Sequence, residues 1–406
     1  MTVHLFGNKS SPAVAMYGLQ KTALEQEKNF GPQARAFVAG DFYVDDGLTS
    51  RPTLQEATEL ILNTQAMLNT ANLRLHKIAS NSSDLMNKIP PQDRADNLKD
   101  LEPQEDSSPV QRALGVCWIL SNDCFTYVIN VPEKPYTRRG VLSVVNSIYD
   151  PLGLALPVTI RRRMLLRDLM KAAAKDNSNT TGWDDPFPDH EQKTWQAWLE
   201  SLKDLEKVLI PRCYIPNYFL DPIVFEIHAL SDASRLAIGV AVYLKIVDLN
   251  GNTNIRLIFA QAKLAPKKLT TIPRLEFCAA VLATRAVQWV ICELKLSISR
   301  VNYYTDSKVT LGYIQNEIRR FFVYVANRVQ IIRALSDPTQ WKYVNSESNP
   351  ADIITRGTIP QRMLSSTWLN GPLFLVAEYA LEENPSYPLE EGDPEIRTAA
   401  IKATTS

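Results

Sequence analysis

The sequence predicts an α/β chain, in the broad sense of an α+β multidomain protein, with a mixed sheet and helices packed on it. From residue 222 the hydrophobic pattern runs strand, strand, strand, helix, strand, helix, helix, strand, helix. Asn250-Gly251-Asn252 separates two strand-like runs, 238–247 and 255–261, and is typical of a tight hairpin turn. Three antiparallel strands followed by helix-linked strands favour a mixed sheet.

The remaining elements of this half follow from local signals. We expect further strands at 224–231, 301–305 and 341–344. A long helix is predicted over 271–296, because Thr270-Thr271 and Pro273 suit a helix cap and first turn.

Upstream, the pattern predicts two short strands and three helices. The strands lie at 113–120 and 124–131, and helices are expected near 138–150 and 159–175. The third helix, 183–205, places Trp195, Trp198, Leu199 and Leu202 at helical spacing, which we interpret as core packing.

Four acidic residues stand where predicted elements meet: Asp232, Glu276, Asp306 and Asp352. Carboxylates that converge from separate rigid elements suit two Mg²⁺ ions, because Mg²⁺ prefers oxygen ligands and keeps several waters. Each acid taken alone also fits an ordinary turn, helix cap or helix-dipole partner. The four together predict a metal site for phosphodiester cleavage.

The residues around these acids resemble a known family. The stretches are Ser231-Asp232-Ala233-Ser234, Pro273-Arg274-Leu275-Glu276, Tyr304-Thr305-Asp306-Ser307, and Asn349-Pro350-Ala351-Asp352 with Thr355-Arg356-Gly357. They are similar to the ribonuclease H domain of retroelement polyproteins. Three further stretches resemble the BEL/Pao (Pao family) LTR retrotransposons: 148–153 within 138–160, 321–329 and 367–372.

The resemblance implies a ribonuclease H-like fold and a hydrolase that cleaves the RNA strand of RNA/DNA hybrids with two Mg²⁺, or Mn²⁺, ions. It implies that Asp232 binds both ions, Glu276 and Asp306 one, and Asp352 the second. In-line attack of water would leave a 3′-hydroxyl and a 5′-phosphate, and 2′-hydroxyl contacts would distinguish RNA from DNA.

The amino-terminal part resembles the end of a reverse transcriptase palm. Phe42-Tyr43-Val44-Asp45-Asp46 is similar to the YxDD box, in which Asp45 and Asp46 would bind metal ions. Asp-Asp-Gly is also an ordinary hairpin turn. A polymerase further needs an aspartate from an earlier strand, and Asp41 is a poor substitute, so we expect no DNA synthesis from this chain alone.

We therefore expect four parts. These are a partial palm (1–90), a thumb or connection region (91–221), the ribonuclease H-like domain (222–360) and a carboxyl-terminal extension with a loose tail (361–406). The tail prediction rests on its Glu-, Pro-, Ser- and Thr-rich composition.

Nucleic-acid binding must rest on local basic clusters, because Lys+Arg and Asp+Glu are both 44 among 406 residues. The expected contacts to an RNA/DNA hybrid are Lys263, Lys267, Lys268 and Arg274, with Arg161, Arg162 and Arg163 as a second track. Any one such cluster also suits a solvated surface. The other expected partners are the remaining reverse transcriptase and integrase parts of a polyprotein.

Five scattered cysteines without ligand spacing favour an intracellular, reducing compartment and no zinc site. No signal pattern or long apolar run predicts secretion or membrane insertion. A retroviral-type aspartic peptidase requires Asp-Ser/Thr-Gly, which does not occur in the sequence. The alternative to a nuclease is a non-catalytic nucleic-acid-binding remnant or a domesticated scaffold.

Overall fold

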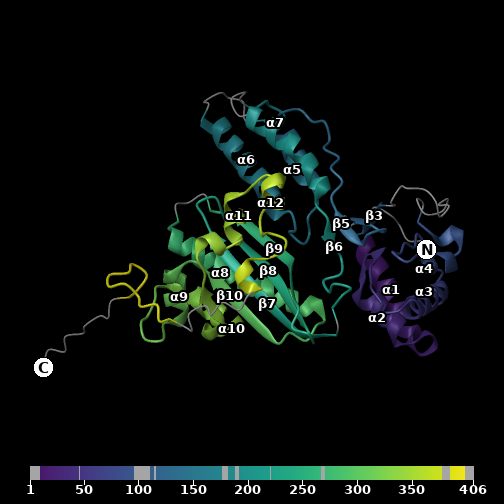
Figure 1. The fold of residues 1–406 in the computed structure, drawn as a ribbon. Coiled ribbons are helices and arrows are strands. Elements are labelled where there is room, and N and C mark those ends of the chain that lie inside the picture. Colours follow the sequence, from purple (N-terminus) through teal and green to yellow (C-terminus); the bar gives the residue numbers. More distant parts are fainter. Residues whose placement is uncertain are drawn as a thin grey trace. The chain divides into compact units, whose positions relative to one another are not determined.

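The computed structural model describes residues 10–44, 46–95, 110–113, 116–175, 182–187, 192–219, 221–266, 270–376 and 385–397. The chain divides into two compact units (Figure 1). The first comprises residues 1–127 with 209–212, and the second comprises 128–208 with 213–406.

The first unit is a small helical body with a strand cluster. Its helices are α1 (Ser11–Phe30), α2 (Pro32–Gly40), α3 (Leu54–Asn69) and α4 (Ser83–Lys88), with the short turn η1 (Pro91–Asp93). The Thr53 hydroxyl caps α3 by accepting from the backbone N–H of Glu56. Ala23, Ala34 and Met67 lie in the core between these helices.

Two sheets belong to the first unit. The hairpin pairs β1 (Phe42–Tyr43) with β2 (Asp46–Gly47). An antiparallel sheet has the order β3 (Val110–Ala113), β4 (Val116–Ile119), β5 (Cys124–Thr126) and β6 (Ile210–Pro211). The strands predicted at 113–120 and 124–131 correspond to β4 and β5, although β5 is shorter than expected.

The second unit is built on a five-stranded mixed sheet with the order β11-β10-β7-β8-β9. The strands are β7 (Pro222–Ala233), β8 (Ala237–Asp248), β9 (Thr253–Leu264), β10 (Arg300–Thr305) and β11 (Trp341–Tyr343). Strands β7, β8 and β9 pair antiparallel, whereas β10 runs parallel to both β7 and β11. The predicted α/β fold class is confirmed, as is the predicted order of strands and helices along the chain.

The β8–β9 hairpin forms at the predicted turn. Gly251 has a φ of +79°, in the left-handed region that favours glycine. The Asp248 carboxylate accepts from the backbone N–H groups of Asn250 (2.9 Å) and Asn252 (2.8 Å), which closes the turn.

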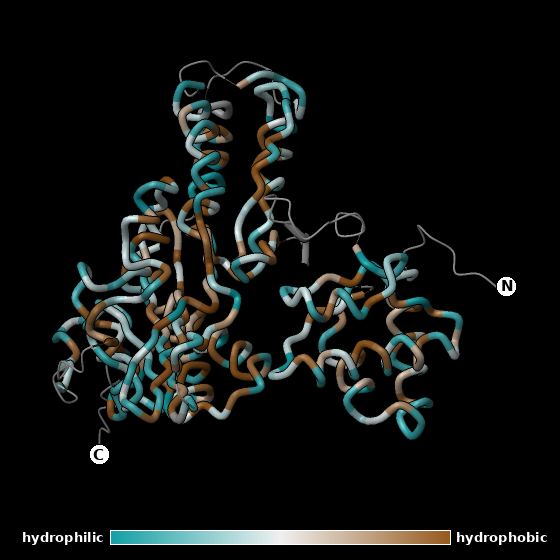
Figure 2. The backbone as a smooth tube through the Cα atoms, turned by 45° about the vertical axis from the view of Figure 1, so that its right-hand side comes forward, coloured by the Kyte–Doolittle hydropathy of each residue, from teal (hydrophilic) through white to brown (hydrophobic). Residues whose placement is uncertain are grey.

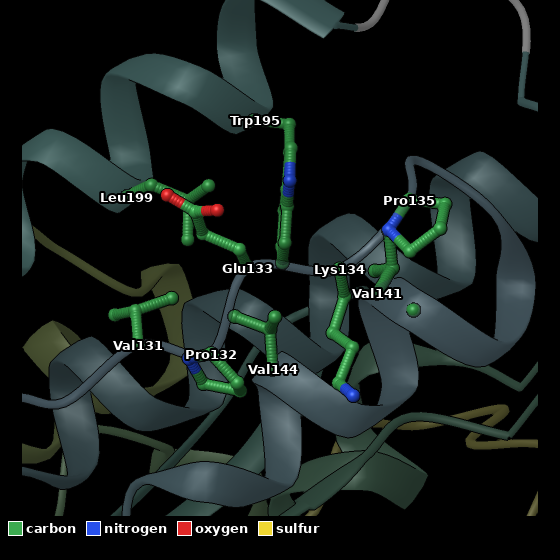
Figure 3. Close-up of a pocket in the computed structure, with 10 residues that line it drawn as sticks. Val131, Pro132, Glu133, Lys134, Pro135, Val141, Val144, Trp195 and Leu199 are labelled. Atoms are coloured by element: carbon green, nitrogen blue, oxygen red, sulfur yellow. The ribbon is translucent and has the colours of Figure 1, made fainter.

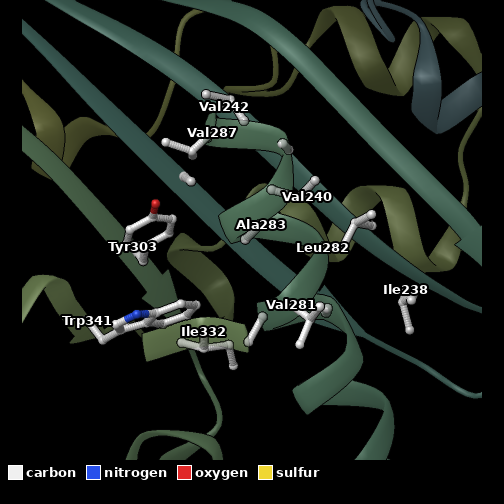
Figure 4. Close-up of a cluster of buried hydrophobic side chains, with 14 of the residues drawn as sticks. Ile238, Val240, Val242, Val281, Leu282, Ala283, Val287, Tyr303, Ile332 and Trp341 are labelled. Carbon is white, nitrogen blue, oxygen red and sulfur yellow. The ribbon is translucent and has the colours of Figure 1, made fainter. Parts of the chain in front are cut away.

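Helix α8 (Ile272–Leu294) covers one face of this sheet. Its small apolar side chains pack against β7 and β8 in the core shown in Figure 4, where Ala283 and Val287 face Val240 and Val242. By length and composition α8 could cross a membrane, but 67% of its most apolar stretch is buried inside the protein. Figure 2 shows hydrophobic stretches (brown) alternating with hydrophilic ones (teal) along the backbone of this unit. Helix α8 is therefore the core helix of the unit.

Shorter helices complete this domain. They are α9 (Lys308–Gln315), α10 (Val323–Leu335), α11 (Ala351–Arg356) and α12 (Pro360–Leu364), with the turns η5 (Pro338–Gln340), η6 (Ser346–Ser348) and η7 (Leu373–Leu375). Trp341 on β11 stacks on Tyr303 of β10 with ring centroids 4.8 Å apart, and both side chains are buried.

Three helices precede the sheet: α5 (Arg138–Ser147), α6 (Leu156–Lys175) and α7 (Gln192–Ser201), the last followed by η4 (Leu202–Lys207). The helix predicted over 183–205 is thus shorter, because the backbone at 182–187 is irregular and Pro186 cannot donate a helical hydrogen bond. Trp195 and Trp198 stack at 5.1 Å and are buried, which confirms their interpretation as core residues.

A pocket of about 270 Å³ lies between α5, α7 and the segment 131–135 (Figure 3). Trp195 and Val144 contribute apolar walls, and none of the four predicted catalytic acids lines it. It lies apart from the candidate site.

The segment 148–157 joins these helices to the sheet. Gly153 has a φ of +74°, and a Cβ there would lie 2.1 Å from the carbonyl oxygen of Ala260 on β9. The Ala260 N–H donates to the Leu152 carbonyl (2.8 Å), and the Thr358 N–H donates to the Pro157 carbonyl (2.9 Å). This stretch therefore docks the helical part against the edge strand and the end of α11.

The segment 367–372 meets this docked stretch. The buried Trp368 indole N–H donates to the Leu154 carbonyl (2.7 Å), and its own carbonyl accepts from the Tyr243 hydroxyl (2.8 Å). Two of the stretches that resemble the Pao family, 138–160 and 367–372, thus contact each other in the folded domain.

The carboxyl-terminal residues 385–397 pack against the domain, which corrects the expectation of a loose tail there. Tyr387, Leu389 and Ile396 contact the apolar core, and Phe321 pairs with Ile396. The composition of this segment predicts a loose tail, but these three spaced apolar side chains become partly buried when the protein folds. Residues 377–384 and 398–406 of the predicted tail lie outside the described part of the chain.

Candidate active site

Asp232 lies at the carboxyl end of β7. The strand ends in a turn where the Ser234 hydroxyl accepts from the N–H groups of Leu236 (3.0 Å) and Ala237 (3.3 Å). The Asp232 side chain is buried, and its Oδ2 accepts a hydrogen bond from the Thr355 hydroxyl of α11. The carboxylate is thereby held in one orientation.

Glu276 reaches the same place from the first turns of α8. Its Oε1 accepts from the Ala233 N–H at 3.2 Å, so the end of β7 and the start of α8 are directly joined. Its Oε2 is buried and has no hydrogen-bond partner among the described residues. A buried carboxylate oxygen without a hydrogen-bond partner is costly, and a bound cation would offset that cost.

Asp306 follows the last residue of β10. Because β10 runs parallel to β7 with Tyr304 opposite Leu230, the ends of the two strands meet at the same edge of the sheet. The Ser346 hydroxyl donates to Asp306 Oδ2.

The structure brings Asp232, Glu276 and Asp306 together, with one carboxylate oxygen of each within 4.8 Å of the others. Burial, and then the charges of Asp232 and Asp306, raises the pKa of Glu276 to about 9. Burial, with Asp306 and Asp352, likewise raises the pKa of Asp232 to about 6 against the opposing Thr355 hydrogen bond. A divalent cation would relieve this repulsion and bind Oε2, so this set of oxygen donors fits a divalent metal ion.

Asp352 stands at the edge of this group. It lies in the first turn of α11, and its Oδ1 pairs with the Arg356 Nε at 2.8 Å. Burial raises the pKa of Asp352, Arg356 lowers it, and Asp306 adds to the rise. The charge of Asp352, the fourth predicted acid, thus influences the other acids, but its carboxylate forms an ion pair with Arg356.

Helix α11 is fastened to β7 and β8 by several contacts. The Ser234 hydroxyl donates to the Thr355 carbonyl (2.8 Å), and the Asn349 amide donates to the Ser231 carbonyl (3.0 Å). A Cβ on Gly239 would lie 2.8 Å from Ile354 Cγ2, so glycine permits the close approach of helix and strand.

The sequence analysis assigned no function to three residues that contact the acids: Thr355, Ser346 and Arg356. Thr355 could have been found from its spacing, because it lies three residues after Asp352 and so shares its side of a helix. Ser346 had no such signal, because its contact depends on how the loop before α11 folds over the end of β10.

The structure describes one of the two predicted polymerase acids, Asp46. Asp45 lies outside the described residues, and Asp46 is exposed on β2. The Asp41 carboxylate accepts from the Thr49 hydroxyl at 2.9 Å.

Five of the seven basic residues predicted to contact the hybrid lie in the described part of the chain. Lys263 is exposed on β9, and Arg163 is exposed on α6 beside the half-buried Arg161. Arg274 lies on α8, two residues before Glu276. Lys267 and Lys268 lie outside the described residues.

Arg162 corrects one of these predictions. Its side chain is buried and donates to the Ile148 carbonyl at 3.0 Å. Burial, and then the charge of Arg163, lowers its pKa to about 10. Three consecutive arginines on a helix point in different directions, so one of them faces inward and cannot contact a phosphate.

The second unit is thus an α/β domain in which three acidic side chains meet at one edge of a mixed sheet. Residues 137–307 match the family model described as "Pao retrotransposon-like RNaseH-like domain". The predicted resemblance to the Pao family is confirmed over this segment, which begins at the cap of α5 and includes Asp232, Glu276 and Asp306. No curated protein matches the chain.

Several solved structures are similar to this chain. The N-terminal RNase H domain of a Mycobacterium tuberculosis protein is 10% identical (TM-score 0.23), with 32% of this chain and 94% of that one covered. LC11-RNase H1 in complex with an RNA/DNA hybrid is 17% identical (TM-score 0.24), with 34% and 99% covered. A foamy viral protease-reverse transcriptase in complex with dsDNA is 12% identical (TM-score 0.20), with 84% and 60% covered.

Proposed function

We propose that the second unit is a metal-dependent ribonuclease H of a Pao-type retrotransposon that cleaves the RNA strand of RNA/DNA hybrids. One observation carries this proposal. Asp232, Glu276 and Asp306 converge from three elements, while Glu276 Oε2 is buried and has no hydrogen-bond partner in the described part of the chain. Such a set of crowded carboxylates is an unfavourable arrangement that bound cations would stabilise.

The residues of the chain orient the site. Asp232, Glu276 and Asp306 would hold the ions, with Asp352 as a further ligand. When bound, divalent ions lower the pKa of water and stabilise charge on a phosphodiester. Thr355 fixes Asp232 and the Ala233 N–H fixes Glu276, so that the remaining oxygens stay turned toward the substrate.

The hybrid would lie across this edge of the sheet. Lys263, Arg274, Arg161 and Arg163 remain our proposed phosphate contacts among the described residues. The segment 148–157 brings α6 next to the end of α11, so Arg161 lies beside Gly357. An intracellular location follows from this substrate and remains part of the proposal.

A labelled RNA/DNA hybrid tests the proposal. We expect Mg²⁺- or Mn²⁺-dependent cleavage that EDTA abolishes, and no cleavage by Asp306→Asn. Asp337→Asn is the matched control, because Asp337 is an exposed capping carboxylate outside the site. Undiminished cleavage by Asp306→Asn would reject the assignment. If the purified wild type, folded and metal-loaded, leaves the hybrid intact, the non-catalytic alternative is favoured.

We also propose that this chain alone lacks polymerase activity. Primer extension on poly(rA) with an oligo(dT) primer tests this directly. Robust dTTP incorporation by the purified chain would contradict it.

A further inference from the structure

An acidic segment packs beside the loop between α9 and α10. Residues 385–397, here called the acidic strap, contain four acids and a single base: Glu390, Glu391, Asp393, Glu395 and Arg397. The strap is joined to the loop between α9 and α10 by two backbone hydrogen bonds, Phe322 N–H to Glu395 (2.9 Å) and Arg397 N–H to Arg320 (2.8 Å). Arg319 and Arg320 of this loop are exposed.

The strap places one carboxylate on Arg274. Glu395 Oε1 accepts from the Arg274 Nε at 2.5 Å, and Oε2 accepts from a terminal guanidinium nitrogen at 3.2 Å. The Glu395 side chain is 7% exposed, whereas Arg274 remains 40% exposed. A fork of two nearly parallel N–H donors on two oxygens is the geometry with which arginine binds carboxylates and phosphates alike.

Arg274 belongs to a small arginine–tyrosine cluster with Tyr324 and Arg328. Its guanidinium lies 4.7 Å from the Tyr324 ring centroid, and that of Arg328 lies at 3.6 Å. Arg328 is held further by donating to the Tyr324 carbonyl (2.9 Å). The tyrosine therefore holds two cations close together, an arrangement that suits a polyanion.

The strap makes a second polar contact beside the first. The Tyr313 hydroxyl donates to Asp393 Oδ2 at 2.8 Å. Asp393 and Glu395, which are separated by one residue, thus each bind a polar side chain of the domain.

We propose that the arginine–tyrosine cluster binds backbone phosphates of the nucleic acid, and that the acidic strap occupies it in the free protein with Glu395 in place of a phosphate. This inference rests on the proposed function, because it takes the hybrid as the ligand. Arg274 and Glu276 both lie in the first turns of α8 but point to different faces of the helix, so a strand held by the cluster runs past the start of the helix that bears one of the acids. Hybrid and strap compete for the same guanidinium.

Competition is tested by binding, without cleavage. The Kd of full-length protein for a fluorescent RNA/DNA hybrid is measured in EDTA for the wild type and for Glu395→Gln. We expect the Kd to fall roughly tenfold in the variant, because the apparent Kd is the intrinsic Kd divided by the fraction of molecules with an open site. Truncation of the strap is avoided, because Leu389 and Ile396 cover the core.

Two controls separate this effect from net charge and from folding. Glu391→Gln removes the same charge from an exposed position of the same strap and should leave the Kd within twofold of wild type. In an Arg274→Gln background, Glu395→Gln should no longer change the Kd, because the shared partner is gone. Equal effects of Glu395→Gln and Glu391→Gln would overturn the proposal, as would an effect that persists without Arg274.

Hydrogen exchange gives a second readout. The amides of Phe322 and Arg397 bond the strap to the domain, so their exchange should accelerate when wild-type protein binds the hybrid. Unchanged or slower exchange would show that the strap stays in place and would refute competition.

The outcomes also distinguish this inference from the nuclease proposal. Tighter binding by Glu395→Gln with no Mg²⁺-dependent cleavage supports the strap and rejects catalysis. Cleavage by the wild type with an unchanged Kd for Glu395→Gln supports the nuclease and rejects the strap. Absence of hybrid binding by all variants rejects both.

Discussion

The hydroxyl of Thr355 donates a hydrogen bond to Oδ2 of Asp232, joining α11 to the end of β7. Thr355 lies on the same short helix as Asp352, and its hydroxyl is also 3.2 Å from the Asp352 carbonyl oxygen. One side chain thus links the strand that bears one acid to the helix that bears another. A hydroxyl in this place orients a ligand carboxylate without binding the ion itself.

Thr355→Val should therefore lower metal-dependent cleavage by roughly 10- to 100-fold, the usual cost of losing a residue that orients a metal ligand. Thr355→Ser restores the hydroxyl and should recover most of the activity. The loss should appear in kcat and in the Mn²⁺ concentration dependence, with KM for the hybrid little changed. Thr310→Val is the control, because its buried hydroxyl has no partner among the described residues. Equal activity losses in both valine variants would point to general damage.

Bound metal should stabilise the fold through Glu276. Saturating Mg²⁺ or Mn²⁺ is expected to raise the free energy of unfolding by about 2.7 kcal/mol at a concentration of 100 times Kd. In Glu276→Gln this stabilisation should largely disappear, since the unpaired Oε2 is replaced. Glu293→Gln changes an exposed glutamate of the same helix and should keep the full metal effect in thermal melts. A metal-induced shift that survives in Glu276→Gln would remove Glu276 from the ligand set.

Acid should weaken the sheet through the buried pair Glu226 and His228. The His228 Nε2 lies 3.3 Å from the Glu226 carboxylate, and its Nδ1 lies 3.0 Å from the Tyr304 hydroxyl. The hydrogen bond from His228 lowers the pKa of Glu226 to about 2, from an ordinary value of 4.5, and burial lowers the pKa of His228 below 6.5. The other charged or titratable groups that act on this pair are Lys245, Arg300, Tyr304 and Lys342.

Both folded-state pKa values lie below the unfolded ones, so the folded state binds fewer protons than the unfolded state. The contribution of His228 to the free energy of unfolding is fully present above pH 6.5. It is lost as the pH falls from 6.5 through the pKa of His228 in the folded protein. The contribution of Glu226 is lost between about pH 4.5 and 2. Urea unfolding at pH 7 and 5 should show a smaller pH dependence in His228→Gln than in the wild type. The same slope in both proteins would contradict the assignment.

Gly239→Ala tests the contact of α11 with β8. The added Cβ would lie 2.8 Å from Ile354 Cγ2, and overpacking of this kind costs about 1–3 kcal/mol. We also expect cleavage to fall, because α11 carries Thr355 and Asp352. Gly18→Ala in α1 meets nothing within 4 Å and should instead stabilise its helix by about 0.5–1 kcal/mol. Denaturant titration with a parallel activity assay gives both quantities.

The sequence alone determined the order of strands and helices in the second unit and the four candidate acids. These features are local in the sequence. Alternation of apolar and polar residues indicates a strand, and Asn250-Gly251-Asn252 indicates the turn of a hairpin. Each acid stands beside a recognisable motif. The places of Asp232, Glu276 and Asp306 between separate predicted elements favoured their convergence, and the resemblance added the fold that would bring them together.

Tertiary structure alone decided which polar groups meet. Arg161, Arg162 and Arg163 are identical in type and adjacent in the sequence. Only the tertiary structure shows that Arg162 is the buried one, because helical geometry turns one of the three side chains inward. The strap docks because Tyr387, Leu389 and Ile396 find apolar partners that are far away in sequence. Thr355 reaches Asp232 across 123 residues. Such contacts depend on packing between distant segments, and no local pattern of residues records them.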